Sequence, residues 1–261
     1  MLPLMRNKRQ SSMRRRFLFS TCILLCSIAT AEPDDGRQKG LDQFAAAYRG
    51  WDGKLFSAAT QTLASEAAKS SATALDYFWL GVARFHLMLH TQHAPGAAPD
   101  ASAVASLRDG AIDALKEAVK RDSRHAEAHA LLGTLYGMKI EGSMLRALWF
   151  GPQVVEHRDL ALALGAENPR VLYLLGTCQY HTAKNAVGYN EALASLLKSE
   201  RYFADEALTP AVLSQPRWGY EACLVFIGRT YEALNSSAEV SRYYQKALER
   251  SPSDHVAKEG L

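Results

Sequence analysis

The chain has 261 residues, of which 48% are hydrophobic and 22% are charged, and its formal net charge is +3. This length and balance are typical of a globular protein with a sizeable core, and they exclude both a disordered chain and a bundle of membrane helices. No stretch interleaves basic with aromatic residues, so the composition also argues against a nucleic-acid-binding surface.

Residues 1–31 have the pattern of a secretory signal peptide. Six cations and no acidic residue occupy positions 1–16, an apolar run follows over 17–28, and Ala29-Thr30-Ala31 precedes Glu32. The apolar run is shorter than the about 20 residues of a membrane-spanning helix, so we expect cleavage after Ala31 and a periplasmic or secreted chain without a span. Loss of the six cations changes the net charge from +3 to −3. Arg14-Arg15 leaves twin-arginine export open beside Sec export, and Met13 is an alternative start.

The following elements are predicted in chain order. Residues 32–40 are polar, with Pro33 and Gly36, and we expect a flexible mature N-terminus. Residues 41–261 form the repeat domain, which begins with helices over 41–48 and 55–69. Later hairpins begin at dipeptides of an aliphatic residue and glycine at one helical phase: Leu80-Gly81, Leu132-Gly133, Leu175-Gly176 and Ile227-Gly228.

Two proline-containing stretches, 91–102 and 202–216, are predicted to be insertions between helices. The return helix of the third hairpin is expected over about 145–164. We expect Gly151-Pro152 to break or kink this helix.

The last hairpin, Trp218 to Pro252, carries Ile227-Gly228-x-x-Tyr231, Tyr244, Ala247 and Pro252 at fixed spacing. This run resembles a tetratricopeptide repeat (TPR). The resemblance implies an all-α, right-handed solenoid of about five antiparallel hairpins that binds a protein or peptide on its concave face. We expect no enzymatic activity and no cofactor, because the sequence has no catalytic motif and no phosphate-binding glycine loop. The glycines recur at intervals of 52, 43 and 52 residues, longer than the 34 of the motif, and this irregularity is similar to exported bacterial repeat proteins of undefined function.

The first helices of the hairpins would line that concave face. Counting by helical spacing from the glycines gives the expected partner-binding residues: Phe85, His86, Glu127, Arg170, Tyr173, Thr177, Tyr180, His181, Arg229 and Glu232. Aromatic and arginine side chains are typical anchors of such contacts. An alternative for Phe85 and Tyr173 is that they are core residues, whereas Arg170, Arg229 and Glu232 are harder to bury.

The histidines His86 and His90, like His125 and His129, have the four-residue spacing of two metal ligands on one helical face. No acidic or cysteine ligand stands beside either pair, so we predict no metal site, and His129 occupies an apolar slot. A periplasmic small-ligand or metal-binding protein using His86, His90 and Tyr180-His181 is the alternative function.

The two cysteines beyond the leader, Cys178 and Cys223, are either separate buried thiols or a bridge between hairpins. A third function, a hydrolase with Cys178 near His181 and Asn185, lacks every familiar catalytic motif. We therefore predict a cell-envelope scaffold or adaptor without catalytic residues.

Overall fold

The computed structural model describes residues 35–93, 98–212, 215–252 and 255–261, all within the compact unit Pro33–Leu261. The predicted leader lies outside these residues. The described chain folds into α-helices only: α1 Asp35–Gly50, α2 Gly53–Ala67, α3 Ala74–Gln92, α4 Ala101–Arg121, α5 Ala126–Ile140, α6 Met144–Leu164, α7 Pro169–Thr182, α8 Ala186–Ala207, α9 Tyr220–Ala233, α10 Ser237–Arg250 and α11 His255–Glu259.

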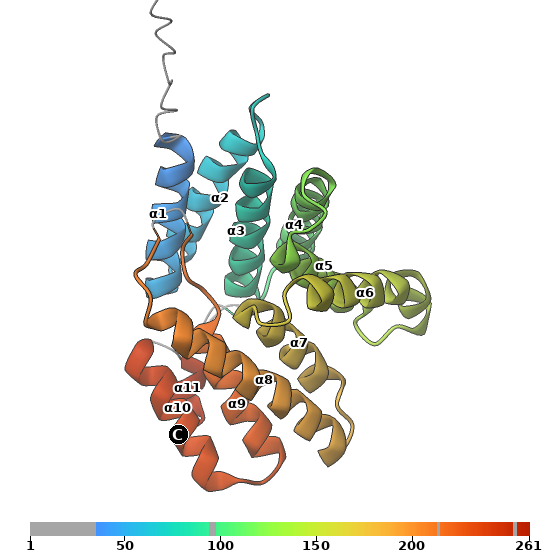
Figure 1. Cartoon of the computed structure of the whole chain (residues 1–261), viewed down its shortest axis with the longest axis vertical. Coiled ribbons are helices and arrows are strands. Elements are labelled where there is room, and N and C mark those ends of the chain that lie inside the picture. The colour runs from blue at the N-terminus through green and yellow to red at the C-terminus, as the bar shows by residue number, and fades with distance from the viewer. Residues whose placement is uncertain (1–34, 94–97, 213–214, 253–254) are drawn as a thin grey trace, which may run out of the picture. The chain divides into compact units, whose positions relative to one another are not determined.

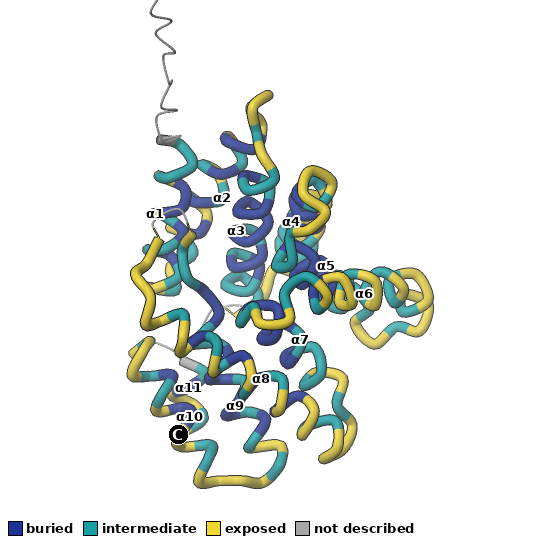
Figure 2. Tube along the Cα trace, viewed as in Figure 1, coloured by how far each residue is buried: buried dark blue, intermediate teal, exposed yellow. Residues whose placement is uncertain are grey.

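Consecutive helices pair as antiparallel hairpins, α1 with α2 through α9 with α10, and α11 packs on α10 (Figure 1). These five hairpins confirm the predicted all-α repeat fold. Neighbouring hairpins meet because the first helix of one contacts the hairpin before it, as α3 contacts α2 and α9 contacts α8. Buried residues accordingly follow the facing sides of the helices (Figure 2).

The recurring glycines lie where the two helices of a hairpin cross. A Cβ placed on Gly176 would lie 2.6 Å from Cγ of Leu196, and one on Gly81 would lie 2.6 Å from Cγ of Leu115. Real Cβ atoms do not approach so closely, so only glycine allows this helix spacing with leucine opposite. The repeat signal in the sequence is therefore a packing requirement.

Side-chain caps explain where several helices begin. Asp52 Oδ1 accepts hydrogen bonds from Lys54 N (2.8 Å) and Leu55 N (3.2 Å) at the start of α2. Asn168 accepts in the same way from Arg170 N, with Pro169 at the first position of α7. These bonds satisfy backbone donors that a helix leaves free at its first turn.

The prediction of a flexible segment over 32–40 is wrong for residues 35–40, which form the first turns of α1. The guanidinium of Arg37 binds both carboxylate oxygens of Asp76, at 2.8 Å from Nη2 to Oδ2, and thereby joins this turn to α3. The insertions predicted over 91–102 and 202–216 are shorter in the structure, because α3 extends to Gln92 and α8 to Ala207.

Helix α6 is continuous from Met144 to Leu164 with Pro152 inside it, so of the predicted break or kink at Gly151-Pro152 the break is wrong. Proline removes one backbone hydrogen bond and leaves the carbonyl of Leu148 without its usual donor. Pro152 is exposed, and water can therefore satisfy that carbonyl.

Cys178 and Cys223 carry free thiols, and Cys223 is buried, so the predicted alternative of a bridge between them is excluded. None of the helices in the described ranges has the length and apolar character needed to cross a membrane.

Candidate functional site

The connection between α8 and α9, described over residues 208–212 and 215–219, lies against the first turns of α3, α5 and α7. Leu75 and Trp79 of α3, Glu127 of α5 and Arg170 of α7 share one cavity lining with it. This connection therefore covers part of the concave face, which the sequence predicts to be open to a partner.

Trp218 anchors the connection, with 2% of its surface exposed. Its ring lies 5.3 Å from that of His86 and 5.6 Å from the guanidinium carbon of Arg170. Next to it, Gly219 donates its backbone N–H to the hydroxyl of Tyr48 at 2.7 Å. Gly219 has φ +97°, a left-handed conformation that favours glycine. The connection thus joins α9 to the first hairpin, far away in the sequence.

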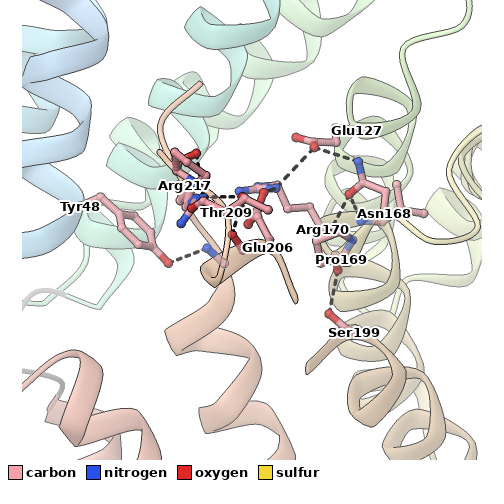
Figure 3. A network of polar contacts seen from close by, with 12 residues as sticks. Tyr48, Glu127, Asn168, Pro169, Arg170, Ser199, Glu206, Thr209 and Arg217 are labelled. Carbon is pink, nitrogen blue, oxygen red and sulfur yellow. Dashed lines mark hydrogen bonds and ion pairs between the residues drawn. The ribbon is translucent and has the colours of Figure 1, made fainter. Parts of the chain in front are cut away.

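Arg170 is the centre of a polar network under this connection (Figure 3). Its guanidinium donates to Glu206 Oε1 at 2.9 Å and Oε2 at 3.1 Å, a bidentate pair, and lies 3.8 Å from Glu127. The Asn168 side-chain amide donates to Glu127 Oε1, the oxygen that lies 3.8 Å from Arg170, at 2.9 Å. Arg217 donates to the carbonyl oxygen of Thr209 at 2.7 Å, which closes the connection on itself. These hydrogen bonds and ion pairs offset the free-energy cost of burying the Arg170 charge.

A cavity of about 230 Å³ lies between this network and the aromatic residues Phe78, Trp79 and Trp218. The indole nitrogens of Trp79 and Trp218 are buried, and neither has a hydrogen-bond partner in the described part of the chain. A space of this size with polar lining residues has room for a few water molecules, which would satisfy both donors if they occupied it. Ligand pockets usually have volumes of about 300–1,000 Å³, so this cavity is small for a dedicated ligand site.

The histidines that suggested a metal are packing residues. The Nδ1–H of His86 donates to the carbonyl of Val82 at 2.9 Å, and burial lowers the pKa of His86 to about 4. His129 is buried as predicted, with Nδ1 3.0 Å from His157 Nδ1 and Nε2 3.1 Å from the Ser123 carbonyl. Over the described ranges, no three histidine, cysteine or acidic side chains are grouped to hold a metal.

A second group of predicted residues comes together at the surface of α7 and α9. Tyr180 and His181 of α7 pack edge-on against Phe226 of α9, at ring distances of 5.6 and 5.5 Å. The guanidinium carbon of Arg229 lies 5.6 Å from the centre of the Phe226 ring, and Glu232 accepts a hydrogen bond from the hydroxyl of Tyr244 at 3.4 Å. We call Tyr180, His181, Phe226, Arg229 and Glu232 the α7–α9 surface cluster.

The surface cluster combines an aromatic platform with polar groups that reach solvent. His181 and Glu232 are exposed, and the other three members are half-buried. Burial, together with the nearby Arg229 cation, lowers the pKa of His181, so its imidazole is neutral at pH 7. A neutral imidazole, a phenol and a guanidinium around one phenyl ring are suited to contact a polypeptide.

The structure divides the ten predicted partner-binding residues into three groups. Phe85, His86, Tyr173 and Thr177 are buried, which is the alternative left open for the aromatic residues. Glu127 and Arg170 belong to the buried network, and the expectation that Arg170 resists burial is wrong because the connection covers it. Tyr180, His181, Arg229 and Glu232 form the surface cluster.

Sequence analysis missed Phe226 and Trp218. Phe226 directly precedes the Ile227-Gly228 pair, and its position on the helix could have placed it beside Arg229. Trp218 stands two residues after Pro216, just beyond the predicted insertion and at the start of the predicted last hairpin. A large apolar residue there is a signal of docking, since exposed loops rarely carry tryptophan.

Cys178 is not poised as a nucleophile. Burial raises the pKa of its thiol, whereas a reactive cysteine needs a lowered pKa. The hydrolase hypothesis therefore has no support from this geometry.

Comparisons with known proteins give one family and one fold. The family model described as "Regulator of microtubule dynamics protein 1-3" matches residues 52–259. None of the curated protein sequences matches the chain. Among solved structures, a thermophilic TPR protein of Thermus thermophilus, TTC0263, is similar with a TM-score of 0.60, 15% identity and coverage of 86% of this chain and 94% of that one. The MamA protein has a TM-score of 0.39, 18% identity and coverage of 87% and 97%.

Proposed function

The chain belongs to the family of regulator of microtubule dynamics proteins 1–3, and on this basis we propose that it is a non-catalytic scaffold that binds a protein partner through the α7–α9 surface cluster. The TPR-like fold supports a protein partner, because stacked hairpins present an extended surface. The α8–α9 connection already covers the concave face near α3, α5 and α7. Of the predicted partner-binding residues, those in the surface cluster are therefore the ones that a partner can reach.

The packing of Arg229 and His181 on Phe226 carries this proposal. Interface hot spots are aromatic and arginine side chains held rigid before binding. Three members of the cluster pack on the Phe226 ring, each less than 6 Å from its centre: Tyr180, His181 and Arg229. A partner would therefore find these side chains already ordered and would lose little entropy on binding.

The family description supports a partner on microtubules. Residues 32–261 have a formal charge of −3, which does not favour direct electrostatic attraction to an acidic polymer. We therefore place the contact with a microtubule-associated protein rather than with the polymer itself.

Co-sedimentation of the full chain with microtubules that retain their associated proteins tests this proposal. We expect the native chain to sediment and the variant Phe226→Ala/Arg229→Ala to bind at least about tenfold more weakly, because hot-spot truncation costs about 2 kcal/mol or more. Arg201→Ala, at an exposed position of α8, is the matched control and should bind normally. Equal binding by the cluster variant contradicts the site; sedimentation of neither protein contradicts the microtubule partner.

The leader pattern of residues 1–31 supports export as a competing proposal, because an exported chain would not meet microtubules. Neither the family nor the described structure bears on this location. N-terminal sequencing of the chain purified from its own cells tests it: a sequence beginning at Glu32 is expected, and retention of residues 17–28 would contradict cleavage. The alternative of a small-ligand protein is less favoured, because the cavity of about 230 Å³ is small.

A further inference from the structure

Two histidine rings join α5 to α6 by a direct contact. Nδ1 of His129 lies 3.0 Å from Nδ1 of His157, and Nε2 of His129 lies 3.1 Å from the carbonyl oxygen of Ser123. His129 is 4% exposed, and His157 is half-buried. The contact lies at the crossing of the two helices, since a Cβ on Gly133 would be 3.7 Å from Cβ of His157. The histidine pair is therefore part of the packing between α5 and α6.

The Ser123 carbonyl determines which nitrogens of the pair carry hydrogen. A carbonyl oxygen only accepts, so Nε2 of His129 is an N–H donor. In neutral His129, Nδ1 then has a lone pair, and Nδ1 of His157 must donate to it. A hydrogen bond between two nitrogens contains one hydrogen, and two N–H groups that face each other at this distance repel. The contact thus limits the number of protons that the two rings can bind.

The pair can bind one further proton without breaking the contact, but not two. The first enters at Nε2 of His157, or it makes His129 the charged donor, and one hydrogen remains between the Nδ1 atoms in both cases. Tyr136 stacks on His157 at 5.8 Å, and the face of an aromatic ring attracts a cation. A second proton puts an N–H on both Nδ1 atoms and two positive charges side by side. The rings must then separate.

The surroundings keep the pair neutral at pH 7. Burial and the neighbouring His129 lower the pKa of His157, whereas Glu156 acts in the opposite direction. Neither ring is hydrogen-bonded to a carboxylate among the described residues. The other charged or titratable groups that act on these rings or on their direct neighbours are His125, Glu127 and Tyr136 of α5, Arg158 of α6, Asp113 of α4, Cys178 of α7 and Asp122 of the α4–α5 turn.

Helix α6 depends on α5 for its position. It packs along α5 and contacts α7 little, and of its 21 residues only Ala161 is buried. Its outer face is exposed (Figure 2), with Met144, Leu145, Leu148 and Trp149 at 74–84%. Separation of the two histidine rings would therefore release α6 while the other hairpins stay packed. A released α6 would fray, because most helical stability in proteins comes from tertiary packing.

We propose that His129 and His157 form an acid-sensitive switch, which releases α6 from α5 when both rings are protonated. The open pair binds at least one proton more than the closed pair. The closed form is therefore fully stable above the ordinary histidine pKa of about 6.5 and loses stability as the pH falls below that value. One extra proton makes the open form about 30-fold more populated at pH 5 than at pH 7.5.

Hydrogen exchange of the full chain, measured by mass spectrometry at pH 7.5 and 5.0 and corrected for intrinsic rates, tests the proposal. We expect the amides of residues 144–164 to exchange at least about tenfold faster at pH 5.0, whereas those of α3 and α8 change less. Helix α3 contains the buried His86 and reports on opening of the whole protein in acid. Unchanged exchange of α6, or equal acceleration in all three helices, overturns the switch.

His157→Gln separates the switch from other effects of acid. An amide offers either its oxygen or an N–H to Nδ1 of His129, so the bond survives protonation of His129. We expect α6 of this variant to exchange at the same corrected rate at both pH values, with an unchanged helical circular dichroism spectrum. His181→Gln, at an exposed position of α7, is the matched control and should keep the native acid response. An acid response of α6 in His157→Gln as large as the native one overturns the proposal.

Discussion

Trp218→Ala is expected to lower the free energy of unfolding by about 3–5 kcal/mol, because truncating a buried tryptophan removes its apolar contacts and leaves a cavity. The indole is 2% exposed and packs on His86 and Arg170, so its loss affects contacts with both α3 and α7. Urea denaturation followed by circular dichroism measures the change.

Leu208→Ala at the other end of the connection is the control, since its side chain is 86% exposed and should change stability by less than about 0.5 kcal/mol. Hydrogen exchange of the Gly219 amide, which bonds to Tyr48 at 2.7 Å, should accelerate in Trp218→Ala before the rest of the protein opens. If Trp218→Ala lowered the free energy of unfolding by less than about 1 kcal/mol, the α8–α9 connection would not be docked on α3 and α7.

Arg170→Met is the second large effect, with an expected loss of about 3 kcal/mol. Removing one partner of a buried ion pair leaves the other charge without compensation. Here Glu127 and Glu206 would remain close together without the guanidinium that binds them. Both carboxylates keep some contact with water, which places the expected loss at the lower end of the usual 3–5 kcal/mol.

The control for this variant is Arg201→Met, an exposed arginine of α8 whose guanidinium stacks on the neighbouring Tyr202. Glu206→Gln added to Arg170→Met should recover part of the lost stability, because it removes one of the two uncompensated charges. If Arg170→Met unfolds at the same urea concentration as the native chain, the network does not stabilise the fold. Arg170 is accordingly unsuitable as a probe of partner binding, since its replacement would disturb the concave face itself.

The repeat architecture could be predicted from amino-acid spacing alone. Gly81, Gly176 and Gly228 share one helical phase because each allows a close helix crossing, and this local requirement is visible in the amino-acid pattern; Gly133 has the same phase, although a Cβ there would make only ordinary contacts. The same holds for the packed His129, which stands in an apolar slot of its helix. Such features depend on neighbours within one hairpin, and their spacing therefore identifies them.

Which predicted contact residues remain at the surface depends on packing between hairpins. Arg170 is buried because Trp218, 48 residues later in the sequence, brings the α8–α9 connection over the start of α7. Tyr180 and His181 reach Phe226 only when α7 and α9 lie side by side. The exposed face of α6 has the same origin, since it depends on the direction in which the next hairpin leaves. Helical periodicity identifies an apolar face, but it does not specify which distant segment covers that face.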